Sequence, residues 1–256
     1  MVIVVKVGTS TLTHSTGMLN IRHIEHLTKV LSDLKNGGHK VVLVSSGAIG
    51  MGVGKLNLSK KPTDMPTKQA AAAIGQCELM YTYDKLFAEY NHTVAQILLT
   101  GDDVKDTTRH ENIKNTIARL LELNVLPIIN ENDTISTDEI AVGDNDTLAA
   151  IVGVTVSADL VVLLSDIEGL YTGDPHTDKN ATLISEVKVI DDGIRALAGG
   201  AGSKLGTGGM STKINAATLC AENGIDMVIA NGSDPDCLYD IISGKPHGTR
   251  FFGRRD

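Results

Sequence analysis

Six short apolar runs, rich in β-branched residues, recur along the chain and are separated by longer segments with a helical period. The apolar runs cover residues 2–7, 40–44, 94–99, 125–129, 160–164 and 226–230, and the helical segments cover residues 21–34, 68–90, 112–123, 144–156 and 210–223. Continuous apolar runs of this length are typical of strands buried on both faces of a parallel sheet. Their alternation with helices predicts βαβ units, so we expect an α/β fold whose mainly parallel sheet is covered by helices.

Length and composition exclude several classes of protein. The 256 residues are 42% hydrophobic and 21% charged, which excludes a disordered chain, and the net charge of -8 has the wrong sign for a general nucleic-acid or anionic-membrane binder. The most apolar stretch, residues 148–164, contains Asp159, so it is not expected to cross a membrane. Cys77, Cys220 and Cys237 form no closely spaced pair, which favours reduced thiols and a cytoplasmic location. We expect one domain over residues 1–256, with two functional halves that meet near Ile151.

Several familiar motifs are missing. No P-loop occurs and no G-x-G-x-x-G segment joins a strand to a helix, so P-loop NTPases and dinucleotide-binding dehydrogenases are not favoured. The G-x-S-x-G and H-E-x-x-H motifs are absent as well. His23 and His26 share one face of a predicted helix, but the sequence indicates no further ligand beside them. We therefore predict no metal site.

A glycine-rich segment precedes the last long helix. It consists of Gly206, Thr207, Gly208, Gly209, Met210, Ser211, Thr212 and Lys213. Glycines at a helix start let backbone N–H groups approach an anion, and the helix dipole attracts phosphate there. Lys213 adds a full positive charge to such a site. The segment indicates phosphate binding or, alternatively, an ordinary loop whose helix is capped by Ser211 or Thr212.

Two further clusters follow the first two predicted strands. Lys6 lies near the C-terminal end of the first apolar run and is followed by Gly8 and Thr9. A lysine in an apolar strand is costly unless it reaches solvent or a negative partner, and a phosphate would serve, because ligands of open α/β sheets bind at that edge. Ser46 and Gly47 follow the second run and offer hydroxyl and N–H groups, or form a tight structural turn.

Acidic and amide side chains gather in residues 130–133 and 143–146, after one predicted strand and before the next helix. Beside two lysines they indicate either a magnesium site or recognition of a substrate ammonium group, although carboxylates alone are also common as solvated caps. We expect Asp144 to cap the following helix and Asp146, in its first turn, to orient the lysines. Residues 134–142, as a small hairpin, and the glycine-rich residues 199–209 are expected to form loops over this site.

Seven segments taken together carry a resemblance. They are VVKVGTSTLT, VSSGAIGMG, TKQAAAAIGQ, INENDTI, VGDNDTLAA, LLSDIEGLYTGDP and GTGGMSTK. In this order and spacing they resemble the glutamate 5-kinase branch of the amino-acid kinase family, and the resemblance covers about residues 2–252. It implies a three-layer α/β/α sandwich in which the N-terminal half, about residues 1–150, binds glutamate and the C-terminal half, about residues 151–256, binds ATP. The implied reaction is ATP-dependent phosphorylation of the γ-carboxylate of L-glutamate to γ-glutamyl phosphate, the first intermediate toward proline.

The resemblance also implies roles for individual residues. Lys6 and Lys213 are implied to flank the transferring phosphoryl group, with Asp146 holding them. The implied glutamate-binding residues are Ser46, Gly47, Asp133 and Asn145, with Asp133 as the partner of the α-ammonium group. The implied ATP-binding residues are Lys6, Gly8, Thr9, Ser165, Asp166, Thr207, Gly208, Gly209, Met210, Ser211, Thr212 and Lys213. At position 165 the family more often has Thr, and Ser keeps the hydroxyl group.

The resemblance further implies ATP as co-substrate, magnesium carried mainly by the nucleotide phosphates, and proline as a feedback inhibitor. Many members of the family continue into a PUA domain, whereas this sequence stops at Asp256, and we expect catalysis without that module. The helical segment 68–90 has apolar residues in excess of one buried stripe, including residues 70–74, which predicts a homodimer or homotetramer.

Two alternatives stay open. One is another member of the family, phosphorylating acetylglutamate, aspartate, carbamate or a nucleotide monophosphate. Asp133 argues against an acetylated substrate, because an uncharged amide would leave its carboxylate unpaired, at a cost of about 1–3 kcal/mol or more. The other alternative is a noncatalytic nucleotide-binding sensor on the same fold, against which the presence of both lysines and Asp146 argues.

Overall fold

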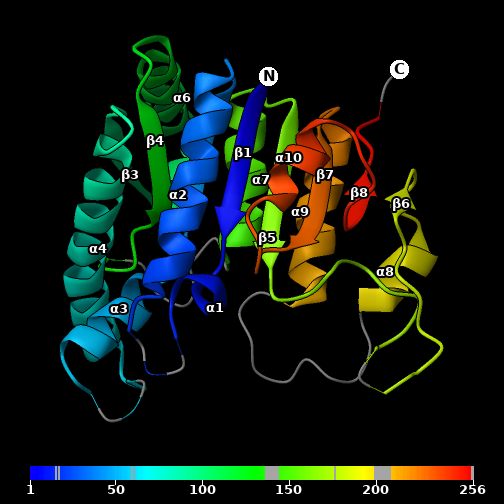
Figure 1. Cartoon of the computed structure of the whole chain (residues 1–256), viewed down its shortest axis with the longest axis horizontal. Coiled ribbons are helices and arrows are strands. Elements are labelled where there is room, and N and C mark those ends of the chain that lie inside the picture. The colour runs from blue at the N-terminus through cyan, green and yellow to red at the C-terminus, as the bar shows by residue number, and fades with distance from the viewer. Residues whose placement is uncertain are drawn as a thin grey trace.

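The computed structural model describes residues 1–14, 16, 18–58, 60, 62–135, 144–175, 177–198 and 209–254, which form one eight-stranded sheet with helices on both faces (Figure 1). The strands are β1 (Val2–Val7), β2 (Lys40–Ser45), β3 (Val94–Leu99), β4 (Leu126–Glu131), β5 (Leu160–Ser165), β6 (Glu186–Val187), β7 (Asp226–Asn231) and β8 (Thr249–Phe251). They lie in the order β3-β4-β2-β1-β5-β7-β8-β6, and each described pair is parallel except β7 with β8. The predicted α/β/α sandwich with a mainly parallel sheet is confirmed.

The helices alternate with the strands. They are α1 (Thr9–Leu12), α2 (Ile21–Asn36), α3 (Ala48–Lys55), α4 (Met65–Ala88), α5 (Gly101–Lys105), α6 (Thr107–Glu122), α7 (Asn145–Thr155), α8 (Asp192–Ala198), α9 (Met210–Glu222) and α10 (Cys237–Ile242). The five predicted helical segments correspond to α2, α4, α6, α7 and α9. The five shorter helices were not predicted, because one or two turns carry too little periodicity to be recognised.

Strand β1 sends alternate side chains into two cores, one on each face of the sheet. Ile3, Val5 and Val7 belong to the core shared with α2, α4 and α10, whereas Val4 belongs to the core shared with α6, α7 and α9. Side chains alternate between the faces of a strand, so Lys6 lies on the same face as Val4. The alternation therefore directs Lys6 toward the layer that contains α7 and α9.

Two local predictions were wrong or incomplete. β3 is an edge strand whose side chains are mostly half buried, so the expectation of burial on both faces fails there. β6 and β8, with two and three residues, were missed because they are too short to show an alternating pattern. Ile151, near which the two functional halves are expected to meet, lies inside α7.

Helices α3 and α4 pack backbone against backbone and so position the loop that follows β2. A Cβ atom added at Gly75 would lie 1.7 Å from the carbonyl oxygen of Ala48, and one added at Gly52 would lie 1.8 Å from that of Ala71. Only glycine permits this approach. Ser46 and Gly47, which precede α3, are thereby held at the C-terminal edge of the sheet. Among the described helices, none is both long and apolar enough to cross a membrane.

Candidate active site

Lys6 and Lys213, which are 207 residues apart, meet at one carboxylate. Lys6 Nζ lies 2.7 Å from Asp146 Oδ1, and Lys213 Nζ lies 2.9 Å from Asp146 Oδ2. β1 supplies the first lysine, the first turn of α7 supplies the aspartate, and the first turn of α9 supplies the second lysine. The side chain of Asp146 is fully buried, and the two lysines are 8% and 4% exposed. The structure thus brings the three expected residues together in what we call the lysine–aspartate cluster (Lys6, Asp146 and Lys213).

The charges of this cluster support each other. Burial by itself would raise the pKa of Asp146, but the charges of Lys6 and Lys213 and their hydrogen bonds hold it below its usual value. Two ammonium groups around one carboxylate leave one net positive charge in a buried position. A buried cation of this kind attracts an anion that desolvates with it, such as a phosphate group.

The N-terminus of α9 opens toward the cluster. Gly209 occupies the N-cap position and no side chain of a described residue caps the helix, so the suggestion that Ser211 or Thr212 is the cap was wrong. Thr212 Oγ1 instead donates to the carbonyl oxygen of Gly209 at 2.7 Å and lies 3.3 Å from Asp146 Oδ2. A helix start beside Lys213 that no described side chain caps leaves backbone N–H groups for an anion. Met210 begins α9. Of the loop expected at 199–209, residues 199–208 lie outside the described residues, and Thr207 and Gly208 are among them.

Gly8 borders the other side of the cluster. A Cβ atom built on Gly8 would lie 3.6 Å from Lys6 Nζ, so the backbone at Gly8 passes close to the ammonium group. Thr9 begins α1 and packs against the first turn of α3, where a Cβ atom on Gly50 would lie 3.3 Å from its methyl group. Gly47 caps α3 with φ +102, a conformation that other residues rarely adopt. The loops after β1 and β2 therefore meet beside Lys6.

A chain of polar side chains links the ends of β2 and β4 to α7. Asn145 Nδ2 donates to Ser46 Oγ at 2.6 Å and to Asn130 Oδ1 at 3.0 Å, and Asn130 Nδ2 donates to Gln76 Oε1 at 2.9 Å. The structure thus places the expected pair of Ser46 and Asn145 in contact. Gln76 was not predicted to belong to the site, although it stands in a segment that contributed to the family resemblance. Its contact with Asn130 orients the amide whose oxygen faces Asn145.

Asp133 follows β4 in a turn and is half buried. Burial, followed by the neighbouring charge of Glu131, raises the pKa of Asp133 to about 6. A carboxyl group in this state gains from a cationic partner, because ionisation is costly without one. This is the environment that an ammonium group would complete. In the hairpin expected at 134–142, Thr134 and Ile135 belong to a turn, and residues 136–142 lie outside the described residues.

Ser165 and Asp166 lie at the end of β5. Ser165 is 7% exposed and its hydroxyl donates to Asp166 Oδ1 at 3.1 Å, while Asp166 itself is exposed. The backbone N–H of Gly232 donates to the Ser165 carbonyl oxygen at 2.7 Å, which joins the ends of β5 and β7. Asp144 caps α7 as expected, accepting from the N–H groups of Asp146 and Thr147.

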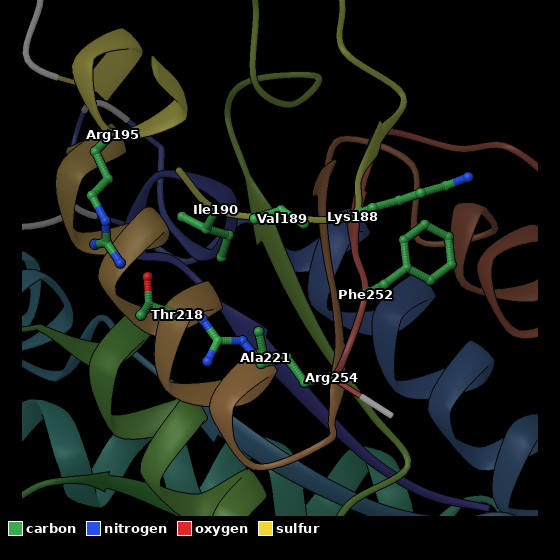
Figure 2. A pocket seen from close by; sticks show the side chains of 8 residues that line it. All are labelled: Lys188, Val189, Ile190, Arg195, Thr218, Ala221, Phe252 and Arg254. Carbon is green, nitrogen blue, oxygen red and sulfur yellow. The ribbon is translucent and has the colours of Figure 1, made fainter. Parts of the chain in front are cut away.

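A separate small pocket lies between β6, α8, α9 and the segment after β8 (Figure 2). Its lining includes three cationic residues, and Figure 2 shows Arg195 and Arg254 extending toward Thr218 while Lys188 points away. None of the residues that the sequence assigns to the site lines this pocket. The candidate site therefore remains the sheet edge around the lysine–aspartate cluster.

Comparison with known proteins agrees with this geometry. The sequence matches the amino acid kinase family over residues 1–231. It is 57% identical over 249 residues to a glutamate 5-kinase from Clostridium tetani, covering 97% of this chain and 93% of that protein. It is 52% identical over 257 residues to a glutamate 5-kinase from Clostridium perfringens, covering 99% of this chain and 96% of that protein.

A solved structure shows the same fold. The carbamate kinase from Giardia lamblia bound to AMP-PNP matches with a TM-score of 0.70 at 17% identity, over 99% of this chain and 98% of that one. At this identity the likeness concerns the fold alone. The fold, the sequence match and the identity to two glutamate 5-kinases agree, and the chain belongs to the amino acid kinase family.

Proposed function

We propose that this chain transfers the γ-phosphoryl group of ATP to the γ-carboxylate of L-glutamate and so forms γ-glutamyl phosphate, which leads toward proline. The observation that carries the proposal is the lysine–aspartate cluster, in which two buried ammonium groups are held at a fixed place by one carboxylate. Glutamate 5-kinases at 57% and 52% identity support the choice of reaction and of acceptor.

The chemistry needs electrostatic help and no general base. A γ-carboxylate is already ionised at neutral pH, so it attacks without losing a proton. The obstacle is the repulsion between this carboxylate and the triphosphate, and it is lowered by positive charge placed around the transferring group. We assign that role to Lys6 and Lys213, with Asp146 keeping both ammonium groups in place. The open N-terminus of α9 adds N–H donors on the same side.

Glutamate recognition is assigned to the sheet edge beside β2 and β4. Asp133 is proposed to bind the α-ammonium group, because its buried carboxyl group gains from a cation. Ser46, Gly47 and Asn145 are proposed to bind the rest of the amino acid through hydroxyl, N–H and amide groups. An acetylated amine lacks the charge that Asp133 requires, so this site favours free glutamate over acetylglutamate.

ATP is the co-substrate, and we propose that it lies between the loop after β1 and the start of α9. Gly8, Thr9, Ser165, Asp166 and residues 207–213 are the groups assigned to it. Asp146 is taken up by two lysines, so we propose that Mg²⁺ is carried mainly by the nucleotide phosphates, whose charge it neutralises.

The remaining expectations are part of this proposal. We propose one domain, with glutamate bound by about residues 1–150 and ATP by about residues 151–256, and a cytoplasmic location where both substrates occur. Proline is proposed to inhibit by competing at Asp133, Ser46 and Asn145. A homodimer or homotetramer is proposed through α4, on which Ala70, Ala73, Cys77 and Tyr81 form an exposed row with helical spacing.

The test is to trap the acyl phosphate with hydroxylamine while glutamate, acetylglutamate and aspartate are offered separately. We expect a hydroxamate with glutamate and at most a trace with the other two. A preference for acetylglutamate or aspartate would contradict the proposed substrate. ATP hydrolysis without any acyl phosphate, or no turnover at all, would contradict the proposed reaction.

A further inference from the structure

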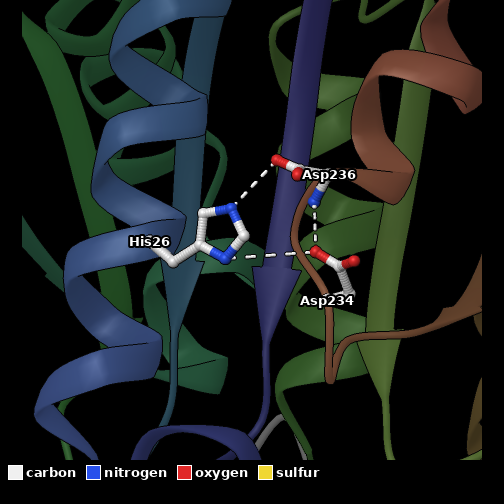
Figure 3. Close-up of side chains that lie close together, drawn as sticks. All are labelled: His26, Asp234 and Asp236. Atoms are coloured by element: carbon white, nitrogen blue, oxygen red, sulfur yellow. Dashed lines mark hydrogen bonds and ion pairs between the residues drawn. The ribbon is translucent and has the colours of Figure 1, made fainter.

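A second constellation of chemically reactive side chains lies on the opposite face of the sheet from Lys213. His26 of α2 faces two carboxylates in the loop between β7 and α10 (Figure 3). His26 Nε2 is 2.9 Å from Asp236 Oδ1, and His26 Nδ1 is 3.9 Å from Asp234 Oδ1. The fold thus adds two ligands to a helix face that showed only histidines in the sequence.

The donor set and its spacing fit a small transition-metal ion. The candidate ligand atoms of His26, Asp234 and Asp236 all lie within 4.8 Å of one another. Zinc binds imidazole nitrogen and carboxylate oxygen at about 2.0–2.2 Å, so the ligand atoms of one tetrahedral zinc lie roughly 3.4 Å apart. The side chains of Asp234 and Asp236 are 70% and 57% exposed, so both are free to turn by the small amount required. Because Mg²⁺ prefers oxygen ligands, a site with one imidazole and two carboxylates suits zinc better than Mg²⁺.

The local field also favours a cation. Neither Asp234 nor Asp236 has an ion pair with lysine or arginine within the part of the chain that is described; His26 is their shared partner there. A divalent cation would relieve this concentration of negative charge.

His23 lies one turn earlier on α2, beside the candidate site. His23 is 7% exposed, and the Nε2 atom of its imidazole has no hydrogen-bond partner among the described residues. His23 lies against the same loop, because a hydrogen bond to the Ser233 backbone and the charges of Asp234 and His26 all act on it. His23 is thus a buried neighbour of the candidate site, whose ligand atoms come from His26, Asp234 and Asp236.

We propose that His26, Asp234 and Asp236 bind a zinc-type divalent cation. The ion joins α2 to the loop before α10, two segments that are more than 200 residues apart in sequence. Through Gly232, whose N–H donates to the Ser165 carbonyl oxygen, the same loop contacts the end of β5. The role of the ion is therefore structural, and the proposal does not depend on the reaction assigned to the other site.

The experiment is isothermal titration of the full-length chain with zinc chloride, in a Cys77→Ser background that removes the exposed thiol. His26→Gln and Asp236→Ala test the ligands, and Asp236 makes no side-chain cap to α10 whose loss would confuse the result. Tyr239→Phe is the matched control, because Tyr239 also joins α10 to α2, through a 2.9 Å hydrogen bond to Asp33, but offers no ligand to the site.

We expect one equivalent of zinc to bind the parent and the Tyr239→Phe protein with equal affinity. Each ligand variant should bind at least about 10-fold more weakly, and zinc should raise the melting temperature of the parent but not of the ligand variants. A parent protein that takes up no zinc at tens of micromolar, or ligand variants that bind as the parent does, would overturn the proposal.

Discussion

Asp146→Asn removes a carboxylate that two buried ammonium groups share. Asp146 is fully buried and lies within 2.9 Å of Lys6 Nζ on one oxygen and of Lys213 Nζ on the other. Breaking a buried ion pair by removing one partner costs about 3–5 kcal/mol, because the remaining charge stays desolvated. Asparagine keeps one acceptor oxygen but turns an NH2 group toward one of the lysines. We therefore expect a loss of at least about 3 kcal/mol, which for a chain of this size lowers the melting temperature by roughly 6–12 °C.

Although Asp146→Asn should destabilise the fold, it should strengthen nucleotide binding. The site of Asp146→Asn carries one more positive charge, and the triphosphate supplies the anion that the lysines have lost. A non-hydrolysable ATP analogue with Mg²⁺ should therefore stabilise the variant more than it stabilises the wild type. Turnover should still fall by roughly 10²- to 10³-fold, because the ammonium groups are no longer held where the transition state needs them.

The assay combines urea unfolding, with and without the analogue, and steady-state kinetics. Asp106→Asn is the control: Asp106 caps α6 through the Arg109 N–H, and asparagine caps equally well, so stability and turnover should stay unchanged. The reasoning is refuted if Asp146→Asn unfolds at the same urea concentration as the wild type. It is also refuted if turnover stays within about threefold of normal.

The site leads to four further predictions. Lys213→Ala should lower kcat by roughly 10²-fold or more with little change in the KM for ATP; normal single-turnover chemistry with lost nucleotide affinity would show that the lysine only binds. The pKa of Asp133 is raised from 3.8 to about 6, so between these pH values the folded protein holds a proton that the unfolded chain releases. The free energy of unfolding should therefore fall as the pH rises from about 4 to 6, and Asp133→Asn should abolish this slope. Ionised Asp133 is needed for the ammonium group, so the KM for glutamate should rise below about pH 6 in the wild type, and Asp133→Asn should raise it far more than the KM for ATP; equal effects would contradict the assignment. Gly75→Ala should cost about 1–3 kcal/mol and raise the KM for glutamate, because its methyl group would meet the Ala48 carbonyl and shift the start of α3; unchanged unfolding would contradict this packing argument.

Local sequence determined the elements of the fold. The apolar runs that became β1, β2, β4, β5 and β7 are buried on both faces, and burial of this kind leaves a continuous apolar pattern that can be recognised without a structure. The cap of α7 by Asp144 was also predictable, because a cap depends on residues only two or three positions away. β8 and the short helices could not be found, because their few residues show no period.

The tertiary structure decided which side chains meet. The sequence suggested that Lys6, Asp146 and Lys213 belong to one site, but their contact depends on β1 lying at the centre of the sheet with α7 and α9 against one of its faces. The contact between Gln76 and Asn130 depends on the order of β2 and β4 and on the glycine contact of α3 with α4. No local period encodes such distances, because they are set by how strands far apart in the sequence are ordered across the sheet. For the same reason His26 carried no metal signal in the sequence, since its two carboxylate neighbours arrive only when the β7 to α10 loop packs against α2.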